Sequence, residues 1–169
     1  MKSLNLRLFF YLLILFPAIA YTLEVKNKSQ KSKYFIKHHK DITYMKDPNG
    51  VILELKALKY PDEQVKGLSG ISRKSLKTNQ GALFIYEEMA PRGFWMPDTY
   101  FDLAIIFLDK NFKVVHIDKK ATSHPGMKEP PIIYKTKVVE AMYVIEVPAD
   151  NPSVFSINVG DKYKILKNR

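Results

Sequence analysis

The chain has 169 residues, with 27 lysines and arginines against 17 aspartates and glutamates, and no cysteine. This length suffices for one domain with a real hydrophobic core. The lack of cysteine excludes a small disulfide-linked toxin or inhibitor, so stability must come from packing. The formal net charge of +10 favours anionic partners, whose attraction would weaken as salt is added.

The first twenty residues have the pattern of a secretory signal peptide. A basic start precedes an apolar run over residues 8–16, and residues 18–20 form an Ala-x-Ala cleavage site. The apolar run is shorter than the roughly 20 residues that a membrane-spanning helix needs. We therefore expect cleavage after Ala20 and export to the periplasm or the extracellular space, with a retained membrane anchor as the alternative.

Residues 21–40 are expected to form a basic flexible arm. Six lysines and no acidic residue lie between Val25 and Lys40. Without residues 1–20 the chain keeps 25 basic and 17 acidic residues, a net charge of +8. A solvated tether is one interpretation of this segment, and an electrostatic arm for an anionic envelope component is the other.

Residues 41–169 are expected to fold as one domain that begins with a hairpin. The sequence Asp-Pro-Asn-Gly at 47–50 places Pro and Gly where a tight turn needs them. Strands are predicted on both sides of it, at 42–45 and 51–57. Apolar residues alternate with charged ones in the second strand, which predicts one buried face.

A short helix and a loop should follow this hairpin. Pro61 suits the first turn of a helix, acidic residues follow it, and Gly67 can end the helix. Residues 71–80 are polar and basic, so they are expected to form an exposed loop.

Two continuous apolar runs, at 82–86 and 103–108, dominate the centre of the chain. Because neither alternates with polar residues, both are predicted to be strands buried on two faces. Between them lies Phe-Trp-Met at 94–96, with the only tryptophan of the chain. Trp95 either fills the core or stacks on a sugar ring or another flat ligand.

The rest of the chain predicts further strands and one long loop. The turn at 109–111 should join the strand at 103–108 to one at 112–117 as a hairpin. Prolines and a glycine interrupt residues 121–131, which predicts a long loop of the kind that carries sites. Strands are also expected at 141–147 and 163–166. Seven or eight short strands with one or two short helices indicate a compact, β-rich α+β domain with a curled or barrel-like, mostly antiparallel sheet.

Several blocks over residues 51–166 resemble, in the right order, the domain of unknown function 192 family (UPF0127). The matching segments are Gly67-Leu68, Gly81 to Phe84, Phe94-Trp95-Met96 with Thr99, the apolar strand closing on Asp109, Tyr143 to Ala149, and Val159-Gly160-Asp161. The family motif continues with a Lys where this chain has Pro97, and its strand-entry Asp is replaced by Ala104. The resemblance therefore does not imply, for this chain, an activity that depends on that Lys and Asp.

Catalytic and metal-binding patterns are sparse. Without cysteine or a Gly-x-Ser-x-Gly motif there is no activated nucleophile, and the histidines have no metal-ligand spacing, so we predict no metal and no cofactor. His116 and His124 stand alone. Asp98 and Asp102 are weak candidates for an acid and base near Trp95, with capping of the backbone as the simpler role.

These observations favour an exported, non-catalytic binding or envelope-associated module. Its ligand is expected at Phe94, Trp95, Met96, Thr99 and Glu146. One alternative is a hydrolase-like enzyme that acts on an envelope saccharide or peptide through Asp98 and Asp102. The other is a structural protein that docks onto a partner. Nucleic acid is not expected as a partner, because no known binding motif is visible and export argues against it.

Overall fold

The computed structural model describes residues 41–166. The predicted signal peptide at 1–20 and basic arm at 21–40 lie outside the described residues. The elements run in the order β1 (Ile42–Lys46), β2 (Ile52–Leu58), α2 (Pro61–Lys66), η1 (Arg73–Ser75), β3 (Gln80–Arg92), β4 (Leu103–Leu108), β5 (Val114–Ala121), β6 (Val139–Pro148), η2 (Pro152–Ser156) and β7 (Lys164–Leu166). Within this part of the chain, no helix is long and apolar enough to cross a membrane.

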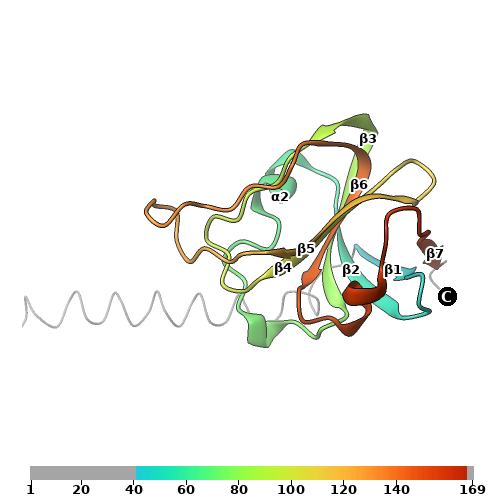
Figure 1. The fold of residues 1–169 in the computed structure, drawn as a ribbon, viewed down its shortest axis with the longest axis horizontal. Helices are drawn as coiled ribbons and strands as arrows, with labels where there is room; N and C mark the ends of the chain where they lie inside the picture. Colours follow the sequence, from blue (N-terminus) through green and yellow to red (C-terminus); the bar gives the residue numbers. More distant parts are fainter. Residues whose placement is uncertain (1–40, 167–169) are drawn as a thin grey trace, which may run out of the picture.

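Seven strands form one sheet in the order β5-β4-β6-β3-β2-β1-β7 within residues 41–166. The β2–β3 pair is parallel, and the other neighbouring strands are antiparallel. The sheet curls into a half-barrel (Figure 1). At one end its edges approach each other, because Tyr163 donates its N–H to the Phe112 carbonyl and Lys113 bridges Lys162. The predicted β-rich α+β class with a curled, mostly antiparallel sheet is confirmed.

The curled sheet buries hydrophobic side chains on both of its faces. One cluster includes Leu58, Phe84 and Phe107, and the other includes Leu55 and Ile106. All six residues of β4 are buried, as the continuous apolar run predicted. Burial of this apolar surface is the main source of stability in a chain without disulfides.

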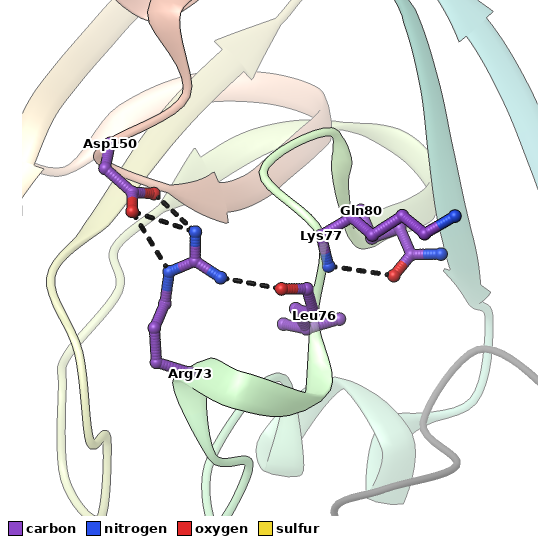
Figure 2. Close-up of polar contacts among 5 residues, drawn as sticks. All are labelled: Arg73, Leu76, Lys77, Gln80 and Asp150. Carbon is purple, nitrogen blue, oxygen red and sulfur yellow. Dashed lines mark hydrogen bonds and ion pairs between the residues drawn. The ribbon is translucent and has the colours of Figure 1, made fainter.

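The segment at 71–80 is more structured than its polar composition suggested. Ile71, Leu76 and Gln80 are buried, so the prediction of an exposed loop is wrong at these positions. The turn of η1 folds the apolar side chains inward, while Arg73 spans outward to the Leu76 carbonyl at 2.6 Å and the Asp150 carboxylate at 2.8 Å (Figure 2). Long-range polar contacts of this kind leave no signal in local composition.

Candidate functional site

A groove with a volume of about 440 Å³ opens between α2, the start of β3 and the chain that follows β3. We call it the Trp95 groove; its walls include Gly67, Leu68, Phe84, Tyr86, Phe94 and Trp95, and Glu146 of β6 also lines it. The groove therefore joins segments that are up to 85 residues apart in the sequence, and the order of the strands in the sheet brings them together.

Glu146 is the buried acid of this groove. Its residue is 5% exposed, and its neighbours in the sheet are Ala82 on β3 and Ile105 on β4. The backbone N–H of Leu68 donates a hydrogen bond to the carboxyl, but the Oε2 atom has no hydrogen-bond partner among the described residues. Burial raises the pKa of Glu146 to about 8, and the Leu68 N–H only partly opposes this. The group is therefore mostly a neutral acid at pH 7.

Aromatic rings surround this acid. Phe84 and Phe94 meet edge to face with centroids 4.8 Å apart, and Phe94 continues to Phe107 at 5.7 Å. Trp95 is 52% exposed. Of the two roles considered for Trp95, the core role is therefore wrong, and the ring stands at the wall of the groove where a ligand can reach it.

Tyr86 contributes a further ring and carries a cation. The Arg92 guanidinium lies over this ring, 3.7 Å from its centroid, although Arg92 does not line the groove. Burial raises the pKa of Tyr86, the Arg92 charge opposes this, and the Glu146 charge adds to it. Tyr86 and Glu146 are thus close enough to influence each other.

The long loop between β5 and β6 pairs with the groove wall that carries Trp95. It extends away from the sheet (Figure 1). Met96 donates its N–H to the Tyr134 carbonyl at 3.1 Å, and Thr99 and His124 exchange two backbone hydrogen bonds. These contacts hold the Trp95 segment in an extended form that alternates its side chains between core and solvent.

His124 connects two parts of this loop through its imidazole ring. The sequence analysis did not predict this role. The side chain is buried, with Nδ1 3.2 Å from the Gly126 carbonyl and Nε2 2.9 Å from the Pro131 carbonyl. Both partners are acceptors, so an imidazole with a single proton can satisfy one of them only. No local pattern predicts this role, because it depends on a fold of the loop seven residues wide.

Four of the five predicted ligand residues line the groove. Phe94, Trp95, Thr99 and Glu146 do so. Met96 does not, because it alternates inward from Trp95 and is 1% exposed in the core. Its prediction as a ligand-binding residue is therefore wrong, because its side chain packs in the hydrophobic cluster with Phe84 and Phe107.

The two predicted catalytic carboxylates lie elsewhere. Asp98 has a positive φ of 50° and accepts a hydrogen bond from the Tyr100 hydroxyl at 2.8 Å. Asp102 accepts the Ser123 N–H at 2.9 Å and pairs with Lys120 at 3.7 Å, and these contacts lower its pKa. Neither carboxylate lines the Trp95 groove. The acid and base pair that a hydrolase would need is not assembled from these two residues.

Asp102 instead belongs to a second, shallower depression of about 500 Å³, which we call the Asp102 hollow. It is lined by Arg73, Phe101, Lys120, Asp150 and Phe155 among others. Arg73 and Asp150 are joined by hydrogen bonds (Figure 2), and the Arg73 guanidinium also lies 5.9 Å from the centre of the Phe101 ring. Arg73 pairs with Asp150, Lys120 pairs with Asp102, and Lys119 donates to the Phe155 carbonyl at 2.7 Å, which leaves little for a ligand to satisfy.

A metal site does not emerge in the described part of the chain. Across residues 41–166, no three side chains of the histidine, cysteine, aspartate or glutamate type lie close enough to hold a metal ion. His116 packs against the Phe107 ring, with 5.6 Å between the ring centroids.

Comparisons with known proteins give a family and a fold. Two solved structures are similar: a proposed transcription regulator from Sinorhizobium meliloti 1021 (21% identity, TM-score 0.55, 73% of this chain and 92% of that one) and a protein of unknown function from Novosphingobium aromaticivorans DSM 12444 (22% identity, TM-score 0.54, 73% and 83%). At this identity they establish the fold alone. None of the curated proteins matches the chain. The sequence profile of DUF192, described as an uncharacterized ACR, matches residues 42–165, and the chain therefore belongs to the DUF192 family, as the motifs at 81–109 and 143–161 predicted.

Proposed function

We propose that this protein is an exported binding module that takes a small ligand in the Trp95 groove. The observation that carries the proposal is the buried Glu146 carboxyl, whose Oε2 atom lacks a partner at a groove walled by the exposed Trp95 ring. Buried polar groups are nearly always hydrogen-bonded, so an unpaired one at a groove marks a place for a ligand atom. The ligand would have an apolar face for Trp95 and a polar group for Glu146.

A non-catalytic role fits the carboxylates better than hydrolysis. Glu146 is the one carboxyl among the described residues that line the groove. Asp98 and Asp102 are engaged by Tyr100, Ser123 and Lys120 outside it. General acid and base catalysis by two carboxylates needs both groups to flank the same bond.

The envelope part of the proposal rests on where the charge lies in the sequence. Residues 41–166 carry 17 basic and 16 acidic residues, a net charge of +1. Residues 21–40 carry six lysines and one glutamate, a net charge of +5. The excess positive charge thus belongs to the arm, and we infer that the arm attracts an anionic envelope component while the nearly neutral domain binds the ligand.

Ligand binding is tested with Trp95 as the reporter, since no other tryptophan contributes to the fluorescence. We expect a ligand from a screen of saccharides, cell-wall fragments and small polar solutes to shift the Trp95 emission and raise the melting temperature. At about 100 times its dissociation constant, a ligand stabilises a protein by about 2.7 kcal/mol.

A matched pair of variants separates the groove from other surfaces. Trp95→Ala should lose the thermal shift, whereas Phe155→Ala, which removes another exposed aromatic ring in the Asp102 hollow, should keep it. An equal loss in both variants, or no ligand at all, would contradict the groove.

Export and arm binding are tested separately. N-terminal sequencing of the exported protein should begin at Tyr21. Replacing the six arm lysines with glutamine should abolish sedimentation with anionic vesicles, which in the wild type should also weaken at high salt. Unchanged sedimentation would contradict the electrostatic arm without affecting the groove.

A further inference from the structure

We propose that the ligand of the Trp95 groove is a small organic ammonium ion, held by the Glu146 carboxylate and by the faces of the surrounding aromatic rings. This inference rests on the proposed binding function and adds the chemical class of the ligand.

The first support is a buried acid without a cationic partner. Among the described residues, neither Lys66 nor Arg92 forms an ion pair with Glu146, and the Leu68 N–H is its single recorded hydrogen-bond donor. A buried carboxylate without a counter-charge is costly in a folded protein. A cation that enters the groove would supply the missing charge.

The second support is the set of rings around this acid. Phe84, Tyr86, Phe94 and Trp95 all line the groove with Glu146. Aromatic faces attract cations through the ring quadrupole, and several rings around one carboxylate suit an ammonium group. The Tyr86 ring already carries the Arg92 guanidinium at 3.7 Å, which shows that rings in this region accept a positive charge.

The third support is the bare backbone at Gly67. A Cβ atom built there would lie 3.0 Å from Phe84 Cζ and 3.1 Å from Glu146 Oε2. The unpaired oxygen and the ring edge therefore face the same space beside Gly67. Both distances are too short for an added Cβ atom, so glycine at this position lets the carboxyl and the ring lie together, the two groups that the ammonium ion would contact.

The pKa of Glu146 predicts a change of ligand affinity with pH that differs in direction between an ammonium ion and a neutral ligand. Glu146 has a pKa of about 8, so an ammonium ion that needs the carboxylate must displace a proton at pH 7. Its affinity should rise about tenfold per pH unit up to about pH 8 and then level off. A neutral ligand that accepts a hydrogen bond from the acid would instead bind more weakly above pH 8.

The other titratable groups of the groove should not produce the same change of ligand affinity between pH 6 and pH 8. The groove also contains Tyr86 from β3 and Lys66 from α2, while β4 contributes the apolar Leu103. Burial raises the pKa of Tyr86 above 10, so this hydroxyl stays neutral through the window. Lys66 is exposed at the rim, and Lys66→Gln controls for its charge.

The test compares choline with 3,3-dimethylbutan-1-ol, which has the same shape and a carbon atom in place of the charged nitrogen. Binding to the purified protein is followed by Trp95 fluorescence between pH 6 and pH 9. We expect choline to bind at least tenfold more tightly than the alcohol at pH 8, with the predicted rise from pH 6 to pH 8. Equal or tighter binding of the alcohol would overturn the inference.

Glu146→Gln is the matched variant. Glutamine keeps the shape, can still accept the Leu68 N–H and can still donate to a neutral ligand, but it carries no charge. We expect this variant to lose at least tenfold in choline affinity and to bind the alcohol as before. Unchanged choline binding would contradict the role of the carboxylate. Trp95→Leu provides a second variant that leaves the acid intact, followed by calorimetry, and it should weaken choline more than the alcohol.

The outcomes separate this inference from the proposed function. If neutral solutes shift the Trp95 emission and choline does not, the ligand class is wrong and the groove remains a binding site. If nothing in either set binds, both proposals fail. Phosphatidylcholine vesicles form a further arm: a response equal to that of free choline assigns the ammonium group to a lipid headgroup, and a response to free choline alone assigns it to a solute.

Discussion

The Trp95 groove contains the Glu146 carboxyl and the Asp102 hollow contains the Asp102 carboxyl, and their surroundings shift the two pKa values in opposite directions. Glu146 is 5% exposed with one unpaired oxygen, and burial raises its pKa to about 8. Asp102 is partly exposed, receives the Ser123 N–H and pairs with Lys120, and its pKa is lowered. Each group accepts a backbone N–H, but Glu146 is fully buried without an ion pair among residues 41–166, whereas Asp102 is partly exposed and has the Lys120 cation beside it.

This contrast teaches which acid is available for a ligand. The contacts of Asp102 are made within the protein, so a ligand there would have to break them. Glu146, whose Oε2 atom has no partner among the described residues, would gain one from the ligand that we propose. Four substitutions test this difference between the two carboxyl groups, and they follow in decreasing order of the stability change that we expect.

The largest effect is expected where the neighbouring strands β3 and β6 approach each other at Gly81 and Glu146. A Cβ atom at Gly81 would collide with the Glu146 carbonyl oxygen and come within 3.0 Å of Val147 Cγ1. Because the clash is with backbone, β3 and β6 would have to separate, and Gly81→Ala should lose about 5 kcal/mol of unfolding free energy, comparable to the whole stability of a small domain. Denaturant unfolding measures this.

Gly93→Ala is the control for this change. The nearest atom to its added Cβ is Val138 Cγ2 at 3.3 Å, on a side chain that can rotate away. We expect a loss below about 1 kcal/mol. If both alanine variants were equally stable, the close approach of the two strands around Glu146 would be wrong.

The second prediction concerns the pH dependence of stability. Between about pH 4.5 and pH 8, folded Glu146 keeps its proton while the unfolded chain has released it. The folded state therefore binds more protons, and this group should lower the unfolding free energy by about 1.4 kcal/mol for each pH unit in that window. Glu146→Gln should remove this slope.

The variant and the wild type should thus be similar in stability at pH 5, and the variant should be more stable at pH 8. Urea unfolding at several pH values measures the difference. A wild type that gains stability over Glu146→Gln as the pH rises would show that the carboxyl has an internal cationic partner and that the groove is not as described.

The third prediction concerns the contacts of Arg73 in the Asp102 hollow. Arg73→Leu removes the paired bonds to Asp150, the bond to the Leu76 carbonyl and the contact with the Phe101 ring. Charge-assisted bonds at a partly exposed site are modest, so we expect a loss of about 1.5 kcal/mol. Lys74→Leu, at the exposed neighbouring position, should change the stability by less than about 0.5 kcal/mol.

Both variants at positions 73 and 74 should leave the ligand response of Trp95 unchanged, since neither residue lines the Trp95 groove. A loss of the Trp95 response in Arg73→Leu, with the fold intact, would mean that the two sites are coupled.

Much of the fold could be predicted because it depends on local patterns. The continuous apolar run of β4 and the turn that follows it identify a buried strand in a hairpin without any long-range information. The helix start at Pro61 and its end at Gly67 are equally local. The prediction of an exposed loop at residues 71–80 failed because the segment is held by a long-range contact, the pair of Arg73 with Asp150.

The candidate site could be predicted only in part. The family resemblance and the single Trp drew attention to Trp95 and Glu146, which do meet in one groove. The sequence could not show that Met96 faces the core, nor that Glu146 is covered by Leu68 from a segment almost 80 residues earlier. The burial of that acid, and hence its unusual pKa, is a property of the sheet order.

The smallest effect is expected at Asp102 itself. Because its folded pKa is lowered, this carboxylate stabilises the protein above its unfolded pKa, near 3.8, and the contribution is lost as the pH falls through the folded value. Asp102→Asn should cost about 0.5 kcal/mol at pH 7, typical of an exposed pair, and this cost should shrink as the pH falls below about 3.8. Its stability difference from the wild type thus shrinks toward acid, as that of Glu146→Gln also does, but the two differences have opposite signs at pH 7. Opposite signs from two carboxyl-to-amide changes in one domain would show that the partners of each carboxyl, and not its residue type, determine its effect. Equal signs would remove the distinction on which the assignment of the groove depends.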